Sequence, residues 1–287
     1  APVEPNVPFG PLWRSTTIGM MVNNVVPARV GELARAFALT RERPSVALTS
    51  AVASIGVDRV FDAIVLFGLM FGAMLAPAFP GTREIGGRPL SSLAATATMG
   101  IGVLLVVLYA LVLFPTSFAA LTERVVGLGS ARWATKAHAA VLAFAGGLSV
   151  LRSPARFAAV LGWTVLHWLC NALAFWVGFI AVGIDVPYSG ALFLQGVIGI
   201  GVAVPSSPGF FGVFEAAAKV GLHDVYRVPE PLAVTWAIGY HILSFIPITV
   251  IGAWYASRLG FSLRQLDDAR EDETSPPAAP RAAERGA

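Results

Sequence analysis

Apolar residues along the chain gather into runs of two lengths, separated by short polar segments. A helix needs about 20 apolar residues to cross the hydrocarbon core of a bilayer, and the runs at 93–114, 157–184 and 231–257 meet that length. The run at 45–77 is also long enough, although it carries three charged residues in its interior. The pattern predicts an all-α, polytopic membrane protein, since the alternating segments of about ten residues typical of a transmembrane β-barrel are missing.

Two further apolar runs, at 12–26 and 189–204, are too short to cross a bilayer comfortably, and each stops close to a proline. The polar, proline-rich residues 261–287 are predicted to form a disordered cytoplasmic tail, which leaves 1–260 as one transmembrane domain. The remaining predicted elements are a surface helix at 29–43, a loop at 80–90, one or two surface or partly inserted helices within 115–154, and a short helix at 210–222.

The two short runs are followed by similar residues about 180 positions apart. Pro27 lies four residues before Gly31, and Pro208 lies four residues before Gly212. A carboxylate follows each glycine, and a polar residue stands 26 positions later inside a long run: Glu32 and Asp58, then Glu215 and His241. Proline-broken short segments in the two halves of a membrane protein are typical of a transport site between inverted repeats.

The distribution of Lys and Arg predicts the orientation of the chain. Most basic residues fall in 28–44, in 115–156 and after 257, so that these segments are expected on the cytoplasmic side. The first short run then enters from the cytoplasm and the second from outside, which is the inverted arrangement of a re-entrant pair.

Composition narrows the class of function. Hydrophobic residues make up 56% of the chain and charged residues 13%, with a mean hydropathy of +0.71, and a soluble domain has about twice that charge. The net charge of +3 reflects arginine-rich loops, so no nucleic-acid partner is expected. Cys170 is the single cysteine, no metal-ligand spacing occurs, and no cofactor is expected. Nucleotide-binding P-loop, HExxH and GxSxG motifs are missing, which argues against an enzyme.

Charged residues inside the run at 45–77 are the first candidates for a site. Asp58 and Asp62 are four residues apart and share a helix face, and Arg59 is within reach of Asp62. An unpaired charge at the bilayer centre costs about 2.5–3.5 kcal/mol on insertion scales. Two interpretations remain open: an ion-pair lock between helices, or the wall of a polar cavity.

A second group of candidates lies at the start of the helix after Pro27. Arg29, Glu32 and Arg35 are spaced by three and share one face. This face fits an amphipathic helix at the membrane surface, and it also fits a phosphate cradle made by two arginines and a helix N-terminus. Asn24 precedes the break, and Gly31 allows close approach of a neighbouring group.

The third group belongs to the second half. Four residues predict a non-helical stretch there: Pro205, Pro208, Gly209 and Gly212. Such backbone is tolerated at membrane depth only where it is buried or lines a cavity, although a plain turn at the surface would have the same composition. The other candidates of this half are Glu215 and Lys219 on one helix face, and Tyr240 and His241 inside the last run. For His241, a simple interhelical hydrogen bond is the alternative to a site role.

These motifs, taken in order, resemble a known family. The pattern consists of Asn24-x-x-Pro27-x-Arg29-x-Gly31-Glu32-x-x-Arg35, Asp58-Arg59, and Pro205-x-x-Pro208-Gly209-x-x-Gly212-x-x-Glu215. It resembles the lysylphosphatidylglycerol synthase transmembrane-region family of flippase-like integral membrane proteins over about residues 12–260. The usual Glu-Arg pair of that family is Asp58-Arg59 here. Members usually begin with further transmembrane helices, so that upstream helices are expected, and some carry a soluble aminoacyl-transferase domain, which is not found in this chain.

The resemblance implies a lipid translocase of a bacterial-type inner (plasma) membrane. Its partner would be an anionic, modified or polyprenyl-phosphate-linked membrane lipid. Arg29, Arg35 and Arg59 would hold the phosphate, and the broken segments would be gates. Glu32, Asp58 and Glu215 would balance the arginines, or bind a cationic head group or a coupling proton. The alternative is a membrane subunit that presents lipid to a soluble glycosyl- or aminoacyl-transferase partner. No oligomeric state follows from the pattern.

Overall fold

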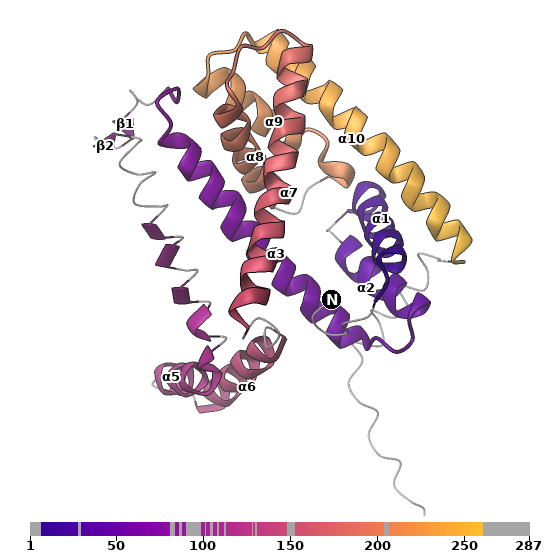
Figure 1. Cartoon of the computed structure of the whole chain (residues 1–287), viewed down its shortest axis with the longest axis vertical. Helices are drawn as coiled ribbons and strands as arrows, with labels where there is room; N and C mark the ends of the chain where they lie inside the picture. Colours follow the sequence, from indigo (N-terminus) through magenta and orange to yellow (C-terminus); the bar gives the residue numbers. More distant parts are fainter. Residues whose placement is uncertain are drawn as a thin grey trace, which may run out of the picture.

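The protein is described by a computed structural model, and nine α-helices account for most of the residues that it describes. The described residues are 7–27, 30–80, 84–85, 88–89, 99–100, 102–103, 106–107, 109–111, 113–127, 129, 131–147, 153–203 and 207–260. The helices are α1 (Phe9–Val25), α2 (Gly31–Glu42), α3 (Leu48–Met74), α5 (Pro115–Gly127), α6 (Ala131–Gly147), α7 (Pro154–Ala181), α8 (Tyr188–Ala203), α9 (Val213–Lys219) and α10 (Glu230–Arg258). Figure 1 shows their arrangement.

The prediction of an all-α fold is confirmed. The two short runs form α1 and α8, the charged run forms α3, and the segment 115–154 folds into the two helices α5 and α6. Among the described residues, α7 and α10 are long and apolar enough to cross a membrane. Most of the predicted span at 93–114, and the whole tail from 261, lie outside the described residues.

Two predicted elements differ from the structure. The loop at 80–90 contains two short antiparallel strands, β1 (Glu84–Ile85) and β2 (Arg88–Pro89). The helix expected at 210–222 begins later, because a single 3₁₀ turn, Pro208–Phe210, and the left-handed Gly212 precede α9. That helix also continues further, as a π-helical turn at Val220–Val225.

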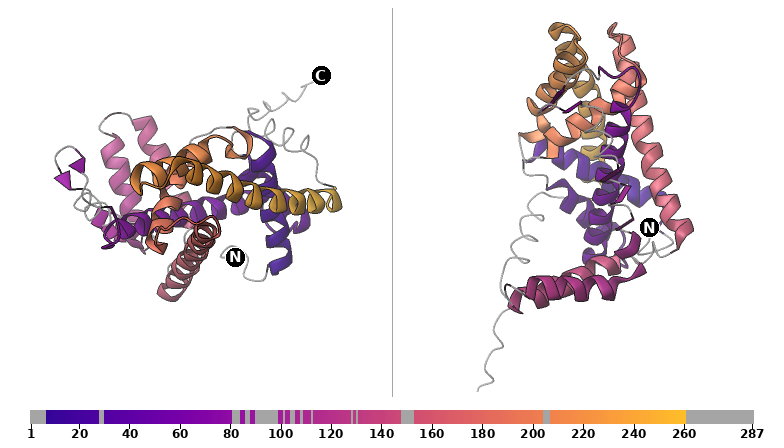
Figure 2. Two further views of the ribbon diagram at one scale, coloured as in Figure 1. Left: turned by 90° about the horizontal axis from the view of Figure 1, so that it is seen from above. Right: turned by 90° about the vertical axis from the view of Figure 1, so that its left-hand side faces the viewer.

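The helices α5 and α6 lie side by side at one end of the molecule, across the direction of α7 (Figure 2). Their surfaces remain largely exposed, and Trp133 of α6 is 63% exposed. A Lys136 ammonium lies 5.1 Å from the centre of the Trp133 ring. An aromatic ring beside a cation is typical of the region where lipid head groups begin.

The helices α1 and α2 form a tight antiparallel hairpin with glycine at its contact. A Cβ on Gly31 would lie 2.1 Å from the carbonyl oxygen of Gly19 and 2.5 Å from the side chain of Asn23. No side chain larger than hydrogen fits such a contact, so the two backbones touch directly. An ion pair between Arg14 and Glu42 closes the other end of the hairpin.

Each short helix packs against the long helix of the other half. The helix α1 lies on α10, where a Cβ on Gly252 would stand 2.4 Å from both the carbonyl oxygen of Thr17 and the Cβ of Met21. The helix α8 lies on α3, where Gly196 faces Met70 at a similar distance. Such an exchange of partners is what an inverted repeat would produce, although the repeat itself stays a prediction.

This packing gives a prediction about α10. Replacement of Gly252 by Ala should lower the free energy of unfolding by about 1–3 kcal/mol, because the new methyl group overlaps the α1 backbone. Gly239 is the matched control, since it is exposed on the same helix and a Cβ there meets nothing within 4 Å. The measurement is the thermal unfolding midpoint of both variants in detergent. Equal midpoints for the two variants would contradict the α1–α10 contact.

Candidate functional site

A left-handed turn separates α8 from α9, and we call residues 207–212 the elbow. The backbone angle φ is +64° at Gly209, +63° at Phe210 and +85° at Gly212. Glycine adopts this region readily, whereas a bulky residue such as phenylalanine rarely does. The hydroxyl of Ser207 closes the turn by donating to the carbonyl of Phe211 at 2.6 Å. The glycine and proline residues of the elbow therefore favour this backbone conformation, and the positive φ of Phe210 adds local strain.

The elbow and α10 are joined through a glutamate and a histidine. The Glu215 carboxylate accepts the N–H of Gly212 at 2.7 Å and contacts Nδ1 of His241 at 2.6 Å. The other nitrogen of His241, Nε2, lies 2.8 Å from the carbonyl oxygen of Gly209. The His241 side chain is 8% exposed and that of Glu215 is 19% exposed. The two residues that the sequence placed 26 positions apart are thus in direct contact.

Aromatic rings surround this pair. Phe211 stacks on the imidazole of His241, with ring centres 4.5 Å apart and an angle of 23° between the planes. Phe214 lies at 4.6 Å on a tilted plane. The neighbouring Tyr240 turns away, and its ring stacks on Trp236 within the apolar core of the second half. Tyr240 therefore packs within the apolar core, whereas His241 makes polar contacts.

The first broken segment meets the elbow. The amide of Asn24, at the end of α1, donates to the hydroxyl of Thr249 on α10 at 2.7 Å. The carbonyl oxygen of Asn24 would lie 3.2 Å from a Cβ on Gly209, and Phe245 would lie even closer, at 2.5 Å. The two motifs, far apart in sequence, therefore share one contact region on α10, which we call the junction.

The charged residues of α3 form a second group. The guanidinium of Arg35 on α2 lies 3.3 Å from the Asp58 carboxylate, and Arg59 lies 3.1 Å from Asp62. The indole N–H of Trp168 on α7 donates to Asp62 at 3.2 Å. The predicted contact between Arg59 and Asp62 is present, and the charges link three helices. These contacts match the ion-pair interpretation, and they leave the Arg35 side chain at the edge of a pocket.

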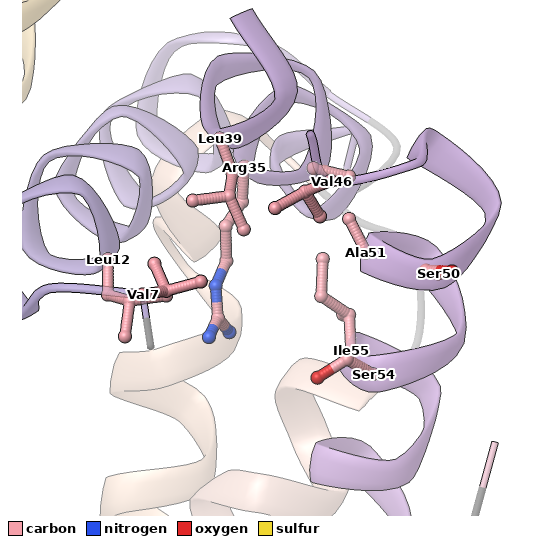
Figure 3. A pocket seen from close by; sticks show the side chains of 10 residues that line it. Val7, Leu12, Arg35, Leu39, Val46, Ser50, Ala51, Ser54 and Ile55 are labelled. Atoms are coloured by element: carbon pink, nitrogen blue, oxygen red, sulfur yellow. The ribbon is translucent and has the colours of Figure 1, made fainter. Parts of the chain in front are cut away.

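The pocket lies between α1, α2 and α3 (Figure 3). Its walls are mostly aliphatic, and its polar groups are the Arg35 guanidinium and the hydroxyls of Ser50 and Ser54. Figure 3 shows the guanidinium reaching into the space between Leu12 on one side and Ile55 on the other. A cation in an apolar, partly open pocket suits an amphipathic ligand with one anionic group.

The first amide of α2 already has a partner. The N–H of Gly31 donates to the side-chain oxygen of Asn23 at 2.8 Å, and the amide of the same Asn23 lies 3.5 Å from the Glu32 carboxylate. A phosphate at this helix N-terminus would therefore have to use the later amides. Arg29 and Pro205 lie outside the described residues.

The structure does not bring Lys219 to the Glu215–His241 pair. Its ammonium lies 2.5 Å from the Glu230 carboxylate, and the two side chains are 41% and 49% exposed. His223, one turn further, contacts the carbonyl of Val228 at 2.8 Å. The reason is that the chain returns after the π-helical turn Val220–Val225 and brings Glu230, at the start of α10, to the Lys219 ammonium.

Three polar partners were missed by the sequence reasoning: Asn23, Trp168 and Thr249. The position of Asn23 directly before Asn24 near a helix break is a signal, because asparagine often caps the start of a helix. Trp168 and Thr249 stand inside apolar runs, and nothing in their own spacing shows which helix they face.

The junction gives a prediction about Thr249. Replacement by valine keeps the shape but removes the short bond of the Asn24 amide and leaves it only the long contact of 3.5 Å to the Phe245 carbonyl, so that the free energy of unfolding should fall by about 0.5–1.5 kcal/mol. Thr235→Val is the matched control, because the Thr235 hydroxyl is exposed and bonds only back to Pro231 of its own helix at 2.7 Å. Chemical denaturation in detergent measures both. A loss as large in the control would show that the Asn24 contact contributes nothing.

Comparison with known proteins agrees with the motifs. A family model described as the lysylphosphatidylglycerol synthase TM region matches residues 1–252. The match confirms the resemblance and makes the chain a membrane protein with a function related to membrane lipid. No curated protein and no solved structure matches the chain. The chain belongs to the lysylphosphatidylglycerol synthase TM region family.

Proposed function

We propose that the chain is a lipid translocase, which moves a phosphate-bearing lipid between the leaflets of an inner (plasma) membrane without changing it chemically. The observation that carries the proposal is the Arg35 guanidinium in the aliphatic pocket between α1, α2 and α3 (Figure 3). The lipid would be anionic, modified or linked through a polyprenyl phosphate, since these share the phosphate group.

The chemistry of Arg35 suits a lipid phosphate. A guanidinium has five N–H donors in a planar fork that matches phosphate oxygens. The bond from Arg35 to Asp58 is long, at 3.3 Å, compared with about 2.7–2.9 Å for a strong charge-assisted bond. A phosphate can therefore share the arginine with Asp58. The neighbouring aliphatic side chains Leu12 and Ile55 would contact the first methylene groups of an acyl chain.

The junction supports a transport cycle. The pocket is built on α1 and α2, and the end of α1 is bonded to α10 through Asn24 and Thr249. The elbow touches the same Asn24. A ligand that displaces the α1–α2 hairpin would therefore shift the contacts of the second half, as alternating access requires.

The test is exchange of fluorescent lipids between leaflets in proteoliposomes that contain phosphatidylglycerol. Arg35→Ala should slow exchange by roughly tenfold or more, because a lost charge-assisted bond contributes about 1.5–3 kcal/mol. Arg35→Lys should retain part of the rate, since the charge stays but the fork is lost. Bleaching of the outer leaflet by dithionite measures the rate.

Arg124→Ala is the matched control, because Arg124 is exposed on α5 and does not line the pocket. Its exchange rate should equal that of the unaltered protein, and the unfolding midpoint of each variant reports on folding. If the unaltered protein exchanges no phospholipid or polyprenyl phosphate, the proposal is wrong. The chain would then be better explained as a membrane subunit that serves a soluble transferase.

A further inference from the structure

The imidazole of His241 lies between two oxygen atoms that belong to different segments. Nε2 is 2.8 Å from the carbonyl oxygen of Gly209 in the elbow. Nδ1 is 2.6 Å from a carboxylate oxygen of Glu215 on α9. A carbonyl oxygen only accepts hydrogen bonds, so Nε2 must carry a hydrogen atom.

The contact between His241 and Glu215 needs one more hydrogen atom. If Nδ1 carries it, the histidine is an imidazolium facing a carboxylate. If the Glu215 oxygen carries it, the histidine is neutral and accepts from a carboxylic acid. In both cases the pair holds one exchangeable proton besides the Nε2 hydrogen. The second Glu215 oxygen takes no part, because it accepts the N–H of Gly212 at 2.7 Å.

Loss of this proton breaks one of the two contacts. A neutral histidine has only one N–H, which can serve either Gly209 or the Glu215 carboxylate. The unserved nitrogen then points a lone pair at an oxygen lone pair within hydrogen-bond distance. Such an arrangement is repulsive in a site that is mostly closed to water. Either the elbow or α9 must therefore move away from α10.

Few other charged groups face the imidazole. Among the described residues, Glu215 is the charged group that contacts it, and Lys219 on the next turn of α9 is bonded to Glu230 instead. Tyr240, the titratable residue next to His241 on α10, stacks on Trp236. The rings of Phe211 and Phe214 cover His241, and aromatic faces favour a cation beside them.

We propose that Glu215 and His241 form a proton-binding site, in which one bound proton fastens the elbow to α10 and its release frees the elbow. On the proposed function, this proton is the ion that couples to lipid movement, because the elbow touches Asn24 of the first half. The fastening itself rests on the geometry of the pair and not on transport.

The variant Glu215→Gln keeps the hydrogen bond to His241 but removes the exchangeable proton. The glutamine oxygen can accept the N–H of Gly212, and its amide can donate to Nδ1 of a neutral His241. Nε2 of that histidine keeps its hydrogen for Gly209. Both contacts survive without an exchangeable proton, so the elbow of this variant should stay bonded to α10 at every pH. Glu215→Ala removes the contacts to Nδ1 and to the Gly212 N–H and leaves only the Nε2 contact to Gly209, so that the elbow should exchange faster than in Glu215→Gln at every pH.

The measurement is hydrogen exchange of peptides covering 207–215 in the full chain, by mass spectrometry, in detergent and without lipid substrate. The ratio of exchange in the unaltered protein to that in Glu215→Gln cancels the intrinsic effect of pH. The folded pair holds a proton that the released state gives up, so raising the pH favours release. The ratio should rise roughly tenfold between about pH 5 and about pH 9.

Glu230→Gln is the control, since it removes a carboxylate from the exposed pair with Lys219 and should leave the pH dependence unchanged. A ratio that stays constant across the pH range, or a Glu215→Gln variant as loose as Glu215→Ala, would overturn the proton-binding site.

A second arm tests the coupling in proteoliposomes. A pH gradient should change the rate of lipid exchange by the unaltered protein at least severalfold and should not affect Glu215→Gln. If lipid exchange is present but insensitive to the gradient in both proteins, the coupling is wrong while the translocase proposal stands. If lipid exchange is absent, the translocase proposal fails, and the hydrogen-exchange result still decides the proton-binding site.

Discussion

Close backbone contact between the two halves is the constraint on which the other features depend. At Gly252 the backbone of α1 lies so near α10 that a methyl group has no room, and at Gly196 of α8 a methyl group would overlap the Met70 side chain of α3. Without a hydrophobic driving force between helices in lipid, such small residues are what lets helices associate. The approach at Gly252 also puts Asn24 within reach of Thr249. The polar contacts of the junction are therefore a consequence of packing that begins with glycine.

The carboxylates of the candidate site follow a common rule in both halves: each contacts a partner on another segment. Asp58 is met by Arg35 from α2, Asp62 by Trp168 from α7, and Glu215 by His241 from α10. An unpaired charge inside a membrane is energetically unfavourable, so these pairs stabilise the contacts between the helices. On the proposed functions, a competing anion or a proton would act on these same contacts, so that binding a ligand and holding the helices together would depend on the same residues.

Features that depend on neighbouring residues could be predicted from the sequence, whereas contacts between separate helices could not. The apolar runs predicted α1, α3, α7, α8 and α10, because run length and burial are local properties. The i,i+3 pair of Arg59 and Asp62 was predictable for the same reason. The partner of Asp58 was not, since Arg35 belongs to another helix, and spacing within one helix carries no information about the next. The shared face of Glu215 and Lys219 was misleading, because a π-helical turn beyond Lys219 and the start of α10 supply Glu230 as a nearer partner.

The contact between α1 and α10 also has a consequence for the order in which the protein is made. Asn24 and Thr249 are 225 residues apart, and ribosomes add about 5–20 residues per second. The end of α1 therefore emerges roughly 10–45 seconds before its partner on α10 exists. During that interval the Asn24 amide and the face of α1 around Thr17 and Met21, which packs on Gly252, have no native contact, and the insertion machinery or bulk lipid must accommodate them. The first half can therefore complete its contacts only after α10 has been made.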